Sequence, residues 1–145
     1  MADVTDHPPF DVSVVTPDGP VFSGEAHMLI VPGAAGEIGV LARHAPLVAT
    51  LKAGSTRVHL GGNEILEFAT GPGFFKVELD RALALVDDAV NVKEIDDSRA
   101  QAQLDAAKAE LEKVEAGDST ADRWQLEQRI RHAENQLSVS GRTTG

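Results

Sequence analysis

The first 92 residues alternate between short apolar runs and turn-forming residues. All seven prolines and ten of the 13 glycines lie in this part of the chain, and the runs recur about every 8 to 12 residues, a spacing typical of a β-sandwich or barrel. The pattern predicts nine strands followed by a short tenth, at residues 10–16, 21–24, 27–31, 36–41, 47–51, 56–60, 64–69, 74–78, 82–87 and 90–92.

Two turn signals support this interpretation. The Pro-Asp-Gly sequence at 17–19 places proline and glycine where a tight turn favours them. The Gly-Gly-Asn sequence at 61–63 supplies residues that tolerate positive φ between two apolar runs. Both sequences predict β-hairpins, and the strict alternation at 56–60 and 75–79 predicts strands with one buried and one exposed face.

The remainder of the chain has a different composition. From residue 96 onward there is no proline, and Ala, Glu, Lys, Gln and Leu predominate, which favours helix. Apolar residues recur there at spacings of three and four in two segments, first at Leu104, Ala107, Leu111 and Val114 and then at Leu126, Ile130, Ala133 and Leu137.

A short connection at 117–119 separates these two segments. Gly117 can end the first helix, and Asp118 and Ser119 are candidate N-caps for the second. Such a short connection predicts an antiparallel helical hairpin, and its thin, alanine-rich seam permits a conformational switch. We therefore expect a ten-stranded β-sandwich domain at 1–92 and a C-terminal α-helical hairpin at 93–145, with frayed ends at 1–9 and 141–145.

Charge and composition exclude several functions. The formal net charge of -10 disfavours binding to nucleic acid, which requires clustered Lys and Arg to neutralise phosphates. No apolar run reaches the roughly 18 to 20 residues that span a bilayer, so direct membrane insertion is not expected. The chain contains no cysteine, which excludes disulfides, a thiolate nucleophile and a zinc-thiolate site.

No catalytic, cofactor or metal site is predicted from the residues themselves. The five histidines, at positions 7, 27, 44, 59 and 132, lack the spacing of a zinc site. The glycine sequences at 61–62 and 71–73 lack the Gly-Lys-Ser/Thr ending of a phosphate loop and are better explained as turns. For Asp96, at the start of the first predicted helix, helix capping is the favoured interpretation.

Two adjacent motifs carry a family resemblance. Gly-Glu-Ile-Gly-Val-Leu at 36–41, followed by His-Ala-Pro-Leu at 44–47, resembles the signature of F-type ATP synthase epsilon subunits. The resemblance extends over about residues 10–139, because the sequences at 14–19, 22–24, 71–77, 95–100 and 135–139 are similar to the family's motifs in the same order. It implies a ten-stranded sandwich joined to two antiparallel helices.

The resemblance also implies partners. In the family the sandwich binds the gamma subunit and rests on the c-subunit ring, so Glu37, in the segment at 34–37, would approach the ring, and His44, Pro46 and Leu47 would lie against gamma. The protein would be a non-catalytic rotor subunit without a cofactor. Because the N-terminus lacks a transit segment, we expect a bacterial protein, bound peripherally at the cytoplasmic side of the cell membrane.

For the hairpin, the resemblance implies inhibition of ATP hydrolysis. Arg123, Arg129 and Arg131 would then face acidic segments of the catalytic beta and alpha subunits, a contact that salt weakens. The alternative is a solvated charged face with helical pairs such as Glu127 to Arg131.

Some family members bind ATP through the I/L-D-x-x-R-A motif, an upstream glutamate and arginines of the last helix. Asp96 and Arg99 match this motif and are the candidate ATP-binding residues. At the other positions this chain has Val90, His132 and Gln136, which removes much of the charge that holds a triphosphate. We therefore expect weak or absent ATP binding.

Without the resemblance, the sequence predicts a β-domain with a helical hairpin that serves as a stand-alone binding or adaptor module. A small hydrolase is a more distant alternative, because no nucleophile elbow is present. Stable association with a gamma subunit would separate the rotor hypothesis from the adaptor hypothesis.

Overall fold

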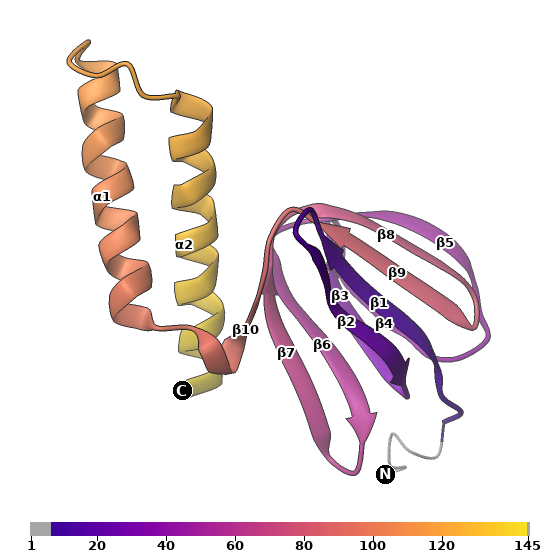
Figure 1. The fold of residues 1–145 in the computed structure, drawn as a ribbon. Coiled ribbons are helices and arrows are strands. Elements are labelled where there is room, and N and C mark those ends of the chain that lie inside the picture. The colour runs from indigo at the N-terminus through magenta and orange to yellow at the C-terminus, as the bar shows by residue number, and fades with distance from the viewer. Residues whose placement is uncertain (1–6, 145) are drawn as a thin grey trace. The chain divides into compact units, whose positions relative to one another are not determined.

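The computed structural model describes residues 7–144, which fall into two compact units, Met1–Asn91 and Val92–Gly145 (Figure 1). The first unit contains ten strands: β1 (Phe10–Thr16), β2 (Gly19–Ala26), β3 (Met28–Gly33), β4 (Gly36–Val40), β5 (His44–Leu51), β6 (Gly54–Gly61), β7 (Glu64–Thr70), β8 (Gly73–Leu79), β9 (Arg81–Val86) and β10 (Ala89–Asn91). The second contains a 3-10 turn, η2 (Val92–Glu94), and two helices, α1 (Asp97–Glu115) and α2 (Arg123–Thr144).

The strands form the predicted sandwich. Their order is β10-β7-β6-β3-β5-β8-β9-β1-β2, with β4 paired to β3. A single register pair, Gly33 with Leu51, joins β3 to β5, so the sheet divides there into two layers. All neighbouring strands are antiparallel except β1 and β9, which run parallel.

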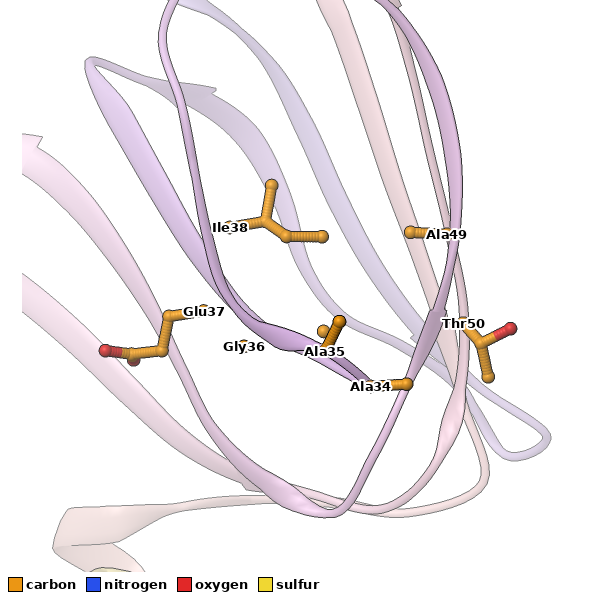
Figure 2. Close-up of a pocket in the computed structure, with 8 residues that line it drawn as sticks. Ala34, Ala35, Gly36, Glu37, Ile38, Ala49 and Thr50 are labelled. Carbon is orange, nitrogen blue, oxygen red and sulfur yellow. The ribbon is translucent and has the colours of Figure 1, made fainter.

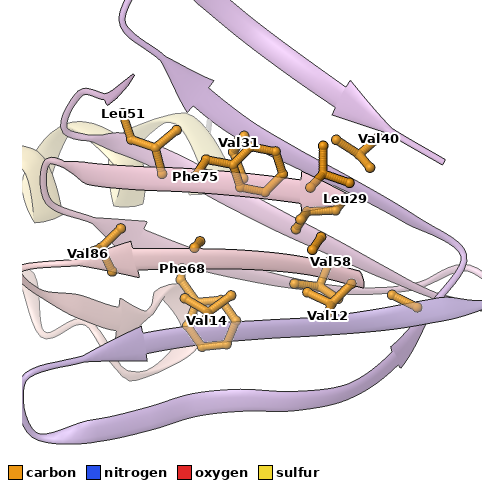
Figure 3. Packing of buried hydrophobic residues seen from close by; sticks show 14 of the residues in the cluster. Val12, Val14, Leu29, Val31, Val40, Leu51, Val58, Phe68, Phe75 and Val86 are labelled. Carbon is orange, nitrogen blue, oxygen red and sulfur yellow. The ribbon is translucent and has the colours of Figure 1, made fainter. Parts of the chain in front are cut away.

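The core lies between the two layers and is mainly aliphatic (Figure 3). Strand β1 shows how alternation produces it, because Phe10, Val12 and Val14 are buried while Asp11 is exposed. Large side chains come from both layers: Leu29 of β3 in the facing layer and Phe75 of β8 in the same layer as β1 are fully buried. The prediction of a ten-stranded sandwich followed by a helical hairpin is therefore confirmed.

Both predicted hairpin turns are present. Residues 17–18 connect β1 to β2, and residues 62–63 connect β6 to β7. The φ values of Gly61, Gly62 and Asn63 are 98°, 59° and 68°, in the left-handed region that glycine and asparagine tolerate. The Gly-Gly-Asn sequence is thus explained by turn geometry.

The Gly-Pro-Gly sequence at 71–73 serves close packing. Gly73 lies in β8 opposite Val86, and a Cβ atom there would collide with the backbone oxygen of Leu85. A Cβ atom on Gly71 would collide with the carboxylate of Asp87. Glycine is required at position 73, where backbone atoms approach closely, whereas at position 71 the Asp87 side chain would have to shift to admit a Cβ atom.

The two helices lie side by side and antiparallel, as predicted (Figure 1). Among the described side chains the buried ones are few and mostly small: Ala100, Leu104 and Ala107 in α1, with Leu126, Ala133, Val139 and Ser140 in α2. The other residues of the predicted seams, Leu111, Val114, Ile130 and Leu137, are only half-buried. Neither helix carries, in the part of the chain described, an apolar stretch long enough to cross a membrane.

The end of α1 follows the prediction, but the start of α2 does not. Gly117 has a φ of 81° and donates its amide to the Val114 oxygen, while Asp118 donates to Lys113, which together form a Schellman motif. The second helix begins later, at Arg123, so the prediction of Asp118 and Ser119 as its N-caps is wrong.

Asp122 takes the capping role instead. Its Oδ1 accepts hydrogen bonds from the amides of Trp124 at 2.9 Å and Gln125 at 3.4 Å. The Ser119 hydroxyl is engaged differently, because it donates to the Glu110 carboxylate at 2.6 Å. The connection between the helices is therefore longer than the sequence indicated.

The two ends that the sequence predicts to fray lie only partly within the described residues. Residues 1–6 and 145 lie outside the described residues, and residues 7–9 belong to no strand or helix. Residues 141–144 lie within the bounds of α2, and fraying of this end stays a prediction. A glycine inside a helix costs only about 1 kcal/mol relative to alanine, and no proline follows to stop the helix.

Candidate functional site

The start of β5 and the end of β8 meet at one end of the sandwich. His44 pairs across the sheet with Leu79, and Leu47 pairs with Val77. Between these pairs Ala45 and Pro46 lie opposite the single residue Glu78, which defines a β-bulge. Bulges often occur beside functional sites because they redirect neighbouring side chains.

The bulged strand presents apolar side chains to the outside. Pro46 is exposed, and Val48, the next outward position, is 71% exposed. Leu47 is half-buried and packs against the core, while the His44 Nδ1 lies 2.6 Å from the Ala45 oxygen. The structure thus brings His44, Pro46 and Leu47 together on one strand and adds Val48, whose outward position follows from strand alternation.

Glu37 lies on a different surface. It follows the tight β3–β4 turn, and its carboxylate accepts a hydrogen bond from Arg57 at 2.6 Å. A hollow near this turn is lined by residues 33–38 together with Ala49 and Thr50. Figure 2 shows the Glu37 side chain directed away from Ala49 and Thr50.

The two surfaces lie at opposite ends of the sandwich. Gly33, beside the β3–β4 turn, pairs with Leu51 at the end of β5, whereas His44 begins the same strand. Strand β5 therefore separates Glu37 from His44, and the structure does not bring these two candidate residues together.

One histidine that the sequence did not single out has a shifted pKa. Burial, followed by the positive charge of Arg57 two residues away, lowers the pKa of His59 below its ordinary value of 6.5. Its Nε2 is buried and has no hydrogen-bond partner in the described part of the chain. This histidine therefore favours the neutral form in the folded protein.

In the helical unit, Asp96 has a structural role. It is the N-cap of α1, and its carboxylate accepts the amide of Arg99 at 3.1 Å. The Arg99 side chain is exposed, while His132 and Gln136 on α2 are half-buried. The capping interpretation of Asp96 is confirmed.

The three arginines of α2 differ in their surroundings. Arg123 makes ion pairs with Glu115 at 3.0 Å and with Glu127 at 3.2 Å, and Arg131 lies 3.9 Å from Glu127. Arg129 is exposed and forms no ion pair with a carboxylate of the described residues. Of these three arginines, Arg129 is thus the one whose charge is least satisfied within the described residues.

No group of three or more His, Cys, Asp or Glu side chains that could hold a metal ion occurs among the residues described. The candidate site residues lie instead on strand ends, a turn and a helix surface. The fold defines a two-unit protein, a β-sandwich followed by a helical hairpin.

Comparison with known sequences specifies this class further. The family model of the ATP synthase delta/epsilon chain β-sandwich domain matches residues 9–92. The ATP synthase epsilon chain of Laribacter hongkongensis is 40% identical over 111 residues, covering 76% of this chain and 79% of that protein. That of Halalkalibacterium halodurans is 37% identical over 135 residues, covering 93% and 99%. The chain belongs to the ATP synthase epsilon-chain family.

Solved structures agree on the fold. A chain of the Euglena gracilis mitochondrial ATP synthase, from an assembly of OSCP, F1 and the c ring, is similar with a TM-score of 0.69 at 22% identity, covering 91% of this chain and 82% of that one. A chain of the Tetrahymena thermophila mitochondrial ATP synthase, from a central stalk and c-ring structure, has a TM-score of 0.55 at 12% identity, covering 96% and 98%.

Proposed function

We propose that the chain is a non-catalytic central-stalk subunit that links the gamma subunit to the c ring of a proton-translocating ATP synthase. The observation that carries this proposal is the position of two candidate surfaces at opposite ends of one rigid sandwich. A linker between two partners needs separate contact surfaces on a body that transmits torque. The subunit would lie peripherally at the cytoplasmic side of the bacterial membrane.

The surface at the start of β5 suits the gamma subunit. Pro46 and Val48 are exposed apolar side chains on a strand anchored in the core through Leu47. An apolar patch on a strand that is already ordered loses little conformational entropy when it binds.

The surface at the β3–β4 turn suits the c ring. Ala34 and Ala35 are small and exposed, so another backbone can approach the turn closely. The ion pair with Arg57 partly neutralises Glu37, which lowers the cost of bringing its carboxylate near a membrane-embedded assembly.

The helical hairpin would act in regulation rather than in catalysis. Its seam is thin, which suits a unit that changes conformation, and Arg129 is available to an acidic partner such as the catalytic beta and alpha subunits. ATP binding at Asp96 and Arg99 is expected to be weak or absent, because the Asp96 carboxylate already caps α1.

A binding experiment tests the gamma contact. The purified chain is titrated against the gamma subunit of the same organism, as wild type and as Val48→Asp, a change at a side chain that is 71% exposed. We expect submicromolar binding by wild type and a loss of about tenfold or more in the variant, because a charge would be buried at the contact.

The matched control is Ile65→Asp, which places the same charge at a 44% exposed position on β7, in the other layer. This variant should bind gamma as wild type does. Absence of wild-type binding would favour the alternative function, a stand-alone adaptor module with the hairpin as its docking surface.

A further inference from the structure

The turn between β8 and β9 holds a leucine in an unfavourable conformation. Leu79 and Asp80 lie between the paired residues Glu78 and Arg81, and Leu79 has a φ of 54°. The first position of a two-residue hairpin loop with positive φ is usually glycine, and a leucine there is strained. The Leu79 side chain is also 70% exposed, so it gains little from burial in the fold.

Neighbouring segments fix this turn in place. The Asp80 carboxylate accepts a hydrogen bond from the backbone amide of Arg43 at 3.0 Å. The backbone carbonyl oxygen of Asp80 accepts one from the backbone amide of Asp11 at 2.9 Å. Arg43 is itself left-handed, with a φ of 62°, and precedes His44, the cross-strand partner of Leu79. Two left-handed residues on different loops are therefore tied together beside the bulge of β5.

The residues around Leu79 are typical of a protein–protein contact rather than of a small-molecule site. The hollow beside it is lined by charged side chains, those of Asp11, Glu78, Asp80 and Arg81. Three of these four are carboxylates, and the Lys76 ammonium lies 3.7 Å from that of Glu78, so the exposed Leu79 side chain has a rim of mixed charge in which carboxylates outnumber cations. Binding anchors commonly combine a central apolar side chain with such a polar rim.

We infer that Leu79 is an anchor residue that inserts into an apolar pocket of the gamma subunit, a pocket rimmed by basic side chains. This inference rests on the proposed function, because Leu79 is the cross-strand partner of His44 and lies at the end of the sandwich that carries the proposed gamma contact. The strained backbone of Leu79 is held by hydrogen bonds of the turn, so the side chain is already positioned before binding. A preorganised side chain loses less conformational entropy when it binds.

Substitution by glycine separates folding from binding. Leu79→Gly removes both the strain and the side chain, so the urea midpoint of the isolated chain should rise while the Kd for gamma increases by about tenfold or more. Leu79→Asn, which also tolerates the left-handed conformation, should weaken binding to a similar extent. Ile65→Asn is the matched control and should leave the Kd unchanged.

The outcomes distinguish this inference from the proposed function. If wild type binds gamma and Val48→Asp weakens binding, but Leu79→Gly and Leu79→Asn bind normally, Leu79 is not an anchor and only this inference is overturned. A lower urea midpoint for Leu79→Gly would show that Leu79 serves the fold, which also overturns it. Absence of wild-type binding would overturn both proposals.

Discussion

Among single residues, His59 couples folding to pH. Its pKa is lowered in the folded chain by burial and then by Arg57, whereas in the unfolded chain it should return to about 6.5. As pH falls below neutrality, the unfolded state therefore binds a proton at this position before the folded state does. The free energy of unfolding should decrease as pH falls through 6.5 toward the folded-state pKa.

The substitution His59→Gln should flatten this dependence, because glutamine carries no titrating group. Urea unfolding of the isolated chain between pH 8 and pH 5 measures the effect, with wild type and variant compared at each pH. An NMR titration of the His59 ring supplies an independent check. A measured pKa at or above 6.5 would contradict the burial argument.

At the scale of elements, the alternation of apolar and polar residues predicted those strands well that have one buried and one exposed face, as in β1 and β6. The ends of β2 were missed because this strand is mostly exposed and lacks an apolar row. The start of β5 was missed because Pro46 lies in a bulge that interrupts the ladder, and proline in a sequence argues against a strand.

The start of α2 was missed for a similar local reason. Asp118, Ser119 and Asp122 are all good capping residues by type, and sequence alone does not decide among them. The structure assigns the role to Asp122, because the Schellman motif engages the Asp118 amide and Glu110 accepts the Ser119 hydroxyl.

This assignment predicts unequal effects of two alanine substitutions. Asp122→Ala should lower the free energy of unfolding of the helical unit by about 1 kcal/mol, because it removes the acceptor for two helix amides. Asp118→Ala is the matched control and should be nearly neutral, since only its backbone amide is engaged. Hydrogen exchange at the amides of Trp124 and Gln125 reports the loss directly. Equal effects of the two changes would contradict the assignment.

For the whole molecule, the family resemblance identified the candidate surface residues, while the structure showed which other residues lie next to them. His44, Pro46 and Leu47 are adjacent in sequence, so a motif can find them. Val48 follows them along β5 by strand alternation, whereas Leu79 comes to His44 only through the pairing of β5 with β8, which no local pattern reveals. Leu79-Asp80 also lacks the glycine or asparagine that usually marks a hairpin turn.

The same limit applies to the hairpin, because the sequence does not distinguish Arg123, Arg129 and Arg131 from one another. Spatial pairing makes them unequal, because Arg123 bridges Glu115 and Glu127 while Arg129 has no such partner in the described part of the chain. If the hairpin inhibits ATP hydrolysis, deletion of residues 99–145 should raise the ATPase rate of the assembled enzyme.

If the hairpin inhibits in this way, Arg129→Ala should relieve part of the inhibition and raise the hydrolysis rate by about twofold to fivefold. This factor corresponds to the loss of one exposed charge contact of roughly 0.5 to 1 kcal/mol. Arg123→Ala should change the hydrolysis rate less, because the charge of Arg123 is already paired with two glutamates of the hairpin.

Rates are measured on the reconstituted complex at low and high salt, and added salt should reduce the difference between wild type and Arg129→Ala. An unchanged rate after the deletion would mean that the hairpin does not restrain hydrolysis, and a salt-independent difference would mean that Arg129 acts by another route than charge.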